Sequence, residues 1–90
     1  MIATTETVDA YLRSWNADDA RARGELLARC WAETGRYLDP RNRAEGREAL
    51  GALIRGYRER NPGTSFQLTS GVDAHDDVLR FHWAIVEPQA

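Results

Sequence analysis

Two residues in the first half of the chain, Tyr11 and Asp39, have side chains suited to proton-transfer chemistry. Tyr11 lies in Thr7–Asp19, a pattern that predicts an amphipathic helix running into a polar turn, and Asp39 lies in Trp31–Pro40, where a helix ends and a short strand begins. A carboxylate in an apolar cavity can act as a general base with a raised pKa. A phenol can donate a hydrogen bond to an atom that gains negative charge in the reaction. We expect a small domain that brings both groups to one apolar pocket.

Both residues also have structural interpretations. Asp39 could cap the turn at Pro40 or pair with a nearby arginine, Arg36 or Arg41. Tyr11 has the helical spacing of a core aromatic residue, whose hydroxyl must find a partner if it is buried. The sequence leaves these alternatives open.

Four aromatic residues are candidates for the wall of a ligand pocket: Trp15, Tyr37, Phe81 and Trp83. Their spacing relative to other apolar residues places them on the apolar faces of a predicted helix and predicted strands. Such faces usually form the core. The four residues could therefore either pack in the core or line a pocket for a flat apolar ligand.

The spacing of the histidines, serines and the single cysteine does not form a metal site or a nucleophilic triad. His75 and His82 belong to no HxxxH or HxH pattern, and no serine lies in an elbow motif. Cys30 falls on the apolar stripe of the second predicted helix, which favours a buried structural thiol. We expect no metal site.

The composition favours one globular domain spanning residues 1–90, with 42% hydrophobic residues. No apolar run or charged leader predicts a membrane span or a secretory signal, so we expect a cytoplasmic protein without a membrane partner. All twelve basic residues are arginine, but fourteen acidic residues outnumber them. This balance argues against nucleic-acid binding.

Helix and strand signals alternate along the first two thirds of the chain. Thr5 is the expected start of a first helix, and Asp18 the expected cap of a second. Arg36–Asp39 predicts a short strand with Tyr37 and Asp39 on one face. Arg47–Glu59 predicts a third helix.

The last third predicts a β-hairpin, because apolar and polar residues alternate on both sides of positions 76 and 77. With a two-residue loop there, Asp73 faces Arg80 and Ser70 faces Trp83. The elements together predict an α+β domain in which three N-terminal helices cover the apolar face of a curved antiparallel sheet.

The chain resembles the nuclear transport factor 2-like superfamily, in particular its polyketide-cyclase (SnoaL-like) and ketosteroid-isomerase-like members. The resemblance covers nearly all ninety residues and rests on four segments. They are the helix-turn-helix from Val8 to Trp31, the strand Tyr37-Leu38-Asp39-Pro40, the helix start Glu45-Gly46-Arg47-Glu48-Ala49-Leu50, and the hairpin segment Leu68-Thr69-Ser70-Gly71-Val72-Asp73-Ala74-His75.

The resemblance implies a cone-like sheet and roles for two residues. In the ketosteroid-isomerase-like members a helix-one tyrosine donates to the substrate oxyanion, and an aspartate before a proline shuttles the proton. Tyr11 and Asp39 occupy the matching places. Chemistry of this type uses side chains only and implies no cofactor.

The resemblance also implies strands beyond the position of Trp83, whereas the printed chain ends at Ala90. We therefore expect a domain that lacks the last strands of the family: a fragment of a longer protein, a dimer that completes its sheet in trans, or a truncated domain. Family members commonly dimerise through the sheet, and an unpaired strand edge attracts a second chain. A homodimer is the expected assembly.

Two functions remain. The first is a pocket protein for a small apolar molecule, which as an enzyme would be a cofactor-free isomerase, cyclase or hydrolase using Asp39 and Tyr11. The alternative is a non-catalytic dimerisation or protein-interaction module.

Overall fold

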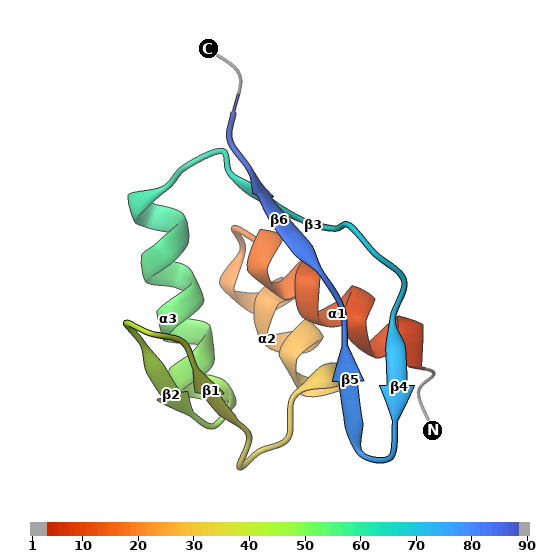
Figure 1. Ribbon diagram of the computed structural model, residues 1–90. Coiled ribbons are helices and arrows are strands. Elements are labelled where there is room, and N and C mark those ends of the chain that lie inside the picture. Colours follow the sequence, from red (N-terminus) through yellow and green to blue (C-terminus); the bar gives the residue numbers. More distant parts are fainter. Residues whose placement is uncertain (1–3, 89–90) are drawn as a thin grey trace.

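The computed structural model describes residues 4–88, and in them three helices and six short antiparallel strands form an α+β fold (Figure 1). In chain order the elements are α1 (Thr4–Asn16), α2 (Ala20–Cys30), β1 (Arg36–Leu38), β2 (Arg43–Glu45), α3 (Arg47–Arg60), β3 (Ser65–Leu68), β4 (Asp73–His75), β5 (Val78–Arg80) and β6 (Trp83–Val86). The strands form three two-stranded ladders that stay open. The predicted fold class is confirmed, and the predicted domain of residues 1–90 extends past the described residues at both ends.

The third helix begins at Arg47, as predicted, whereas the starts of the first two helices differ from the prediction. Asp19, not Asp18, caps α2, since its carboxylate accepts a hydrogen bond from the Ala22 N–H at 2.8 Å. Asp18 instead accepts from the guanidinium of Arg58 on α3. Among the described residues α1 begins one residue before Thr5, which therefore lies inside the helix.

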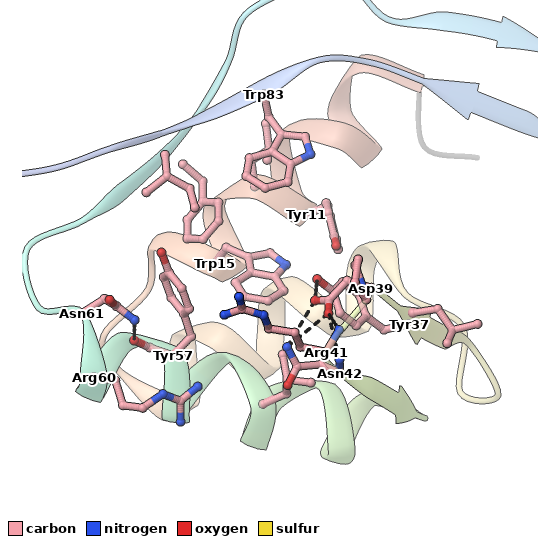
Figure 2. A pocket seen from close by; sticks show the side chains of 16 residues that line it. Tyr11, Trp15, Tyr37, Asp39, Arg41, Asn42, Tyr57, Arg60, Asn61 and Trp83 are labelled. Atoms are coloured by element: carbon pink, nitrogen blue, oxygen red, sulfur yellow. Dashed lines mark hydrogen bonds between the residues drawn. The ribbon is translucent and has the colours of Figure 1, made fainter.

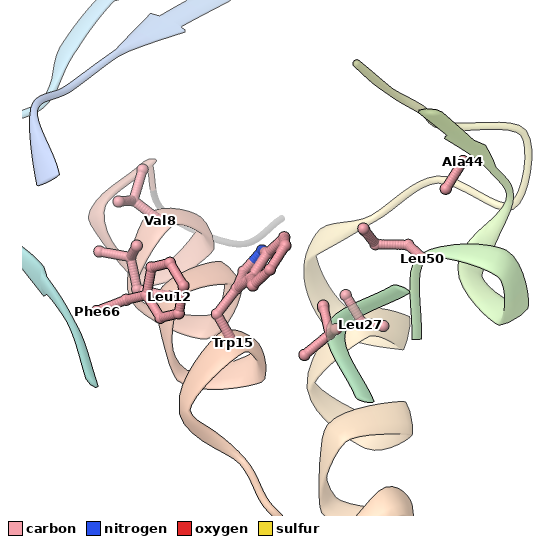
Figure 3. Packing of buried hydrophobic residues seen from close by; sticks show 8 residues of the cluster. Val8, Leu12, Trp15, Leu27, Ala44, Leu50 and Phe66 are labelled. Atoms are coloured by element: carbon pink, nitrogen blue, oxygen red, sulfur yellow. The ribbon is translucent and has the colours of Figure 1, made fainter. Parts of the chain in front are cut away.

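The hydrophobic core lies between the three helices (Figure 3). Leu50 and Ile54 of α3 are 0% exposed, and Leu27 of α2 is 1% exposed. Burial of each such side chain stabilises the fold by about 1.5–3 kcal/mol. The buried apolar cluster consists of Val8, Leu12, Trp15, Leu27, Ala44, Leu50, Ile54 and Phe66. The core therefore fixes one aromatic residue of α1 and one of β3.

A short hairpin formed by β1 and β2 was not predicted, although β1 itself was. Tyr37 of β1 lies opposite the buried Ala44 of β2, and both point inward. Leu38 points away and is 68% exposed. This alternation confirms the prediction that Tyr37 and Asp39 share one face of the strand.

The C-terminal hairpin lies across α1 and consists of two ladders with different registers (Figure 1). The β4–β5 ladder pairs Asp73 with Arg80, as predicted. The β3–β6 ladder pairs Leu68, not Ser70, with Trp83, so the predicted register is wrong in this half. Between the ladders, residues 69–72 of one arm face only residues 81–82 of the other. The first arm thus has two extra residues at the point where the Ser70 hydroxyl accepts a hydrogen bond from the His82 N–H.

A buried arginine joins the ends of α1 and α3 to the start of β3. The side chain of Arg58 is 7% exposed. Its Nη1 donates to the carbonyl oxygens of Trp15 at 3.1 Å and Thr64 at 2.8 Å. Its Nε donates to the Asp18 carboxylate at 2.7 Å. Arg58 thus satisfies two buried carbonyl groups that lie outside regular ladders.

Within residues 4–88 the longest helix has 14 residues, and none has the length and apolar character needed to cross a membrane.

Candidate functional site

A cavity of about 750 Å³ opens where α1, the β1–β2 turn, α3 and the β3–β6 ladder meet (Figure 2). Both Tyr11 and Asp39 line it, which confirms the prediction that the two groups share one hollow. The half-exposed Trp83 of β6 forms part of its rim. The volume is within the range of small-molecule sites in proteins.

Aromatic rings form the wall of the cavity around Trp15 of α1. The Trp15 ring centroid lies 5.7 Å from that of Tyr37, 6.0 Å from that of Tyr57 and 5.1 Å from that of Phe66. Phe66 in turn lies 5.6 Å from Trp83. Such tilted and edge-on pairs give an apolar surface that suits a flat ligand.

The four predicted wall residues do not all line this cavity. Trp15, Tyr37 and Trp83 do. Phe81 instead packs edge-on against Tyr11, with a centroid distance of 6.5 Å, and lines a smaller cavity of about 320 Å³ beside Cys30. The two-residue excess between the ladders separates Phe81 from the face of Trp83.

Sequence reasoning missed four of the polar lining residues and gave the aromatic residues Tyr57 and Phe66 no role in the pocket. The four polar residues are Arg41, Asn42, Arg60 and Asn61. They come from the β1–β2 turn and from the end of α3, two segments that only the fold brings together. No local sequence pattern marks them.

Asp39 caps the β1–β2 turn. Its Oδ1 accepts hydrogen bonds from the backbone N–H groups of Arg41 and Asn42, both at 2.8 Å, and its Oδ2 accepts from the Tyr37 hydroxyl at 2.7 Å. The Tyr37 bond, followed by the Arg41 amide, lowers the pKa of Asp39 from its ordinary value. The expected raised pKa is therefore wrong, and the expected turn cap is confirmed. Within residues 4–88 Asp39 forms no ion pair with Arg36 or Arg41.

The two phenols beside Asp39 are held in their protonated form. Burial raises the pKa of Tyr11, an effect opposed in part by a hydrogen bond with Trp15. Burial and then the bond to Asp39 raise the pKa of Tyr37. The Tyr11 ring is fixed by stacking on Trp31, with centroids 5.6 Å apart. At neutral pH the cavity thus holds an ionised carboxylate next to two neutral hydroxyl donors.

This arrangement fits general base chemistry by its protonation states, since the carboxylate is free of its proton and the phenols keep theirs. Hydroxyl donors lining a partly dry cavity can stabilise an oxyanion.

Comparisons with known proteins agree with this fold. The model of the SnoaL-like domain family matches residues 8–89. Among solved structures, the chain is similar to the crystal structure of a proposed isomerase of the SnoaL-like family from Agrobacterium tumefaciens strain C58. The sequence identity is 34% and the TM-score 0.86, over 94% of this chain and 75% of that chain. Comparison with the curated proteins gives no significant match. The resemblance to the nuclear transport factor 2-like superfamily is thus confirmed, and the chain belongs to the SnoaL-like domain family.

Proposed function

We propose that this SnoaL-like protein binds a flat apolar molecule with an enolisable carbonyl group and acts on it as a cofactor-free isomerase or cyclase. The observation that carries the proposal is that an ionised carboxylate, Asp39, and a protonated phenol, Tyr11, line one aromatic cavity. Trp15, Tyr37 and Trp83 would hold the ligand. The solved relative named as a proposed isomerase supports the same class of reaction.

In the proposed reaction Asp39 takes a proton from the carbon next to the substrate carbonyl. The electron pair of that C–H bond moves into an enolate, whose oxygen accepts a hydrogen bond from the Tyr11 hydroxyl. In an isomerisation, Asp39 returns the proton to a different carbon. In a cyclisation, the enolate carbon attacks a second carbonyl carbon, and the resulting alkoxide takes the proton from Asp39.

The low pKa of Asp39 makes it a weaker base than a carboxylate in an apolar site. The Tyr37 hydroxyl contributes to this by donating to Oδ2. A positioned general base contributes about 10²- to 10⁴-fold to a rate, and a good oxyanion donor about 10²- to 10³-fold. The proposed mechanism therefore depends on both Asp39 and Tyr11.

Exchange of substrate α-protons for deuterium, followed by NMR on a panel of bicyclic ketones, tests the mechanism. Asp39→Asn removes the base while keeping an oxygen that can accept the turn hydrogen bonds, and we expect it to slow exchange at least about 100-fold. Tyr11→Phe should slow it to a similar extent. Asp77→Asn, in the exposed β4–β5 turn, is the matched control. Equal exchange in the Asp39→Asn variant and the parent, or none in the parent, would refute the mechanism.

A second candidate function is a non-catalytic dimerisation module, and we propose a homodimer through the sheet. It is supported by the exposed apolar side chains of β6: Trp83 is 50%, Ile85 40% and Val86 40% exposed. Within residues 4–88, β6 pairs only with β3, so its other edge is free.

Native mass spectrometry over a range of concentrations tests the dimer. Val86→Lys should weaken it because it adds a charge beside the free strand edge. Val78→Lys on β5, a position that is 63% exposed, is the matched control. A strict monomer at high concentration contradicts the dimer, and so does equal dissociation in both variants.

A further inference from the structure

Two exposed arginines line the aromatic cavity. Of the twelve arginines in the chain, only Arg41 and Arg60 line it. Arg41 belongs to the β1–β2 turn, and Arg60 is the last residue of α3. Figure 2 shows Arg60 at the end of α3, well away from Asp39 and Tyr37, and Arg41 beside Asp39. The aromatic lining thus includes two cationic side chains.

Neither arginine is neutralised within the part of the chain that the structure describes. Five other arginines pair there with carboxylates: Arg13, Arg21, Arg47, Arg55 and Arg58. No such pair involves Arg41 or Arg60. The one acidic residue in the described lining, Asp39, already accepts bonds from the Tyr37 hydroxyl and from two backbone amides. Both guanidinium groups can therefore accept an external anion.

The Arg60 guanidinium lies close to Gly56 of α3. A Cβ atom on Gly56 would lie 3.0 Å from Arg60 Nη1, so the absence of a side chain lets the guanidinium fold back along the helix. Glycine inside a helix costs on the order of 1 kcal/mol relative to alanine.

The charges also determine where an anion can bind. A guanidinium group is planar and weakly hydrated and matches a carboxylate with two parallel hydrogen bonds. A second carboxylate close to Asp39 would be repelled, so it must lie toward the Arg60 end. Flat apolar rings then lie against Trp15 and Trp83, which leaves the reactive carbon toward Asp39.

We propose that the ligand is a flat aromatic carboxylic acid, whose rings occupy the aromatic wall and whose carboxylate binds between Arg41 and Arg60. This inference rests on the proposed function of the same cavity and adds the chemical class of its ligand.

The test compares two probes of the same shape, naphthalene-2-carboxylate and its neutral amide, naphthalene-2-carboxamide. Calorimetric titration at low salt should give a Kd about tenfold lower for the carboxylate, as a partly exposed charge-assisted pair allows. Arg41→Gln and Arg60→Gln should each remove most of this preference, measured as the ratio of the two Kd values in the same variant. Arg29→Gln, an exposed arginine of α2 outside the cavity, is the matched control. Both variants should fold, since neither side chain makes a hydrogen bond within residues 4–88.

The outcomes separate the two proposals. Equal binding of both probes overturns the anion site but leaves the pocket function intact. An equal loss in the Arg29→Gln protein also overturns it, because the preference would then reflect overall charge. If neither probe binds, the cavity does not accept flat aromatic molecules, and both proposals fail.

Discussion

Replacing Arg58 by methionine tests whether one buried guanidinium holds together the segments that build the cavity. Methionine keeps an unbranched apolar chain in the space of the arginine stem and removes only the donors. The carbonyl oxygens of Trp15 and Thr64 then lose their partner, and both bonds are buried. A buried acceptor without a partner costs about 1–3 kcal/mol. For two such carbonyl oxygens, to which water regains partial access, we expect a loss of about 2–4 kcal/mol in the free energy of unfolding.

Such a loss is a large share of the stability of a small domain, which is usually about 5–15 kcal/mol. With a shift of about 4–8 °C per kcal/mol for a domain of this size, the melting temperature should fall by about 8–32 °C. Urea unfolding followed by tryptophan fluorescence measures the change, since Trp15 lies at the site of the perturbation. Arg55→Met is the matched control: this arginine lies on the same helix, is 69% exposed and pairs with Glu59. It should cost no more than about 0.5 kcal/mol.

Equal stability of the Arg58→Met and Arg55→Met variants would show that the buried guanidinium does not hold these segments together. Asp18→Asn should cost less than Arg58→Met, because its carboxylate is exposed and the two carbonyl groups keep their donor. A loss in Asp18→Asn equal to that in Arg58→Met would mean that the ion pair, not the carbonyl bonds, carries the effect.

Gly51→Ala should raise the free energy of unfolding by about 0.5–1 kcal/mol in urea, because its Cβ would meet Leu27 Cδ1 at an ordinary 3.7 Å; a loss of stability would contradict this. The hydrogen bond from Arg58 lowers the pKa of Asp18 from its ordinary 3.8. The contribution of Asp18 to the free energy of unfolding is therefore present above pH 3.8 and lost as the pH falls through its pKa in the folded state. Asp18→Asn should thus make the free energy of unfolding less dependent on pH in the acid range. Burial raises the pKa of Cys30, and native protein should react with iodoacetamide roughly tenfold more slowly than protein in urea; equal rates would show an accessible thiol.

The helices were predictable because their signals are local. Apolar residues one turn apart and a carboxylate near the start of α2 identify the elements without tertiary information. The choice between Asp18 and Asp19 as the cap was not local. Arg58, forty residues away, binds the first carboxylate and leaves the second to cap the helix.

The strands were harder to predict because they are short and their pairing depends on single side chains. The three-residue strand β2 has one apolar residue, Ala44, so it carries almost no alternation signal. In the C-terminal hairpin, alternation gave the correct pairing of Asp73 with Arg80. The bond between the Ser70 hydroxyl and the His82 amide shifts the rest of the register, and no pattern of apolar residues reveals it.

The candidate site was predicted in its parts but not in its electrostatics. Tyr11, Trp15 and Asp39 all line the cavity, as expected. The predicted direction of the Asp39 pKa shift was wrong, because the Tyr37 hydroxyl and then the backbone amides of the turn outweigh desolvation. Those partners depend on how the turn closes, and the turn closes because β2, which was not predicted, pairs with β1.

The cavity draws its lining from positions as far apart as Tyr11 and Ile85, so it exists only when nearly the whole chain is assembled. A compound that occupies it binds the native state alone and must delay melting of the entire domain. At a concentration of 100 times its Kd, such a compound would add about 2.7 kcal/mol, a thermal shift of about 10–20 °C. A chemical library can therefore be screened by dye-based thermofluor before any reaction is known, and the hits would themselves identify the chemistry.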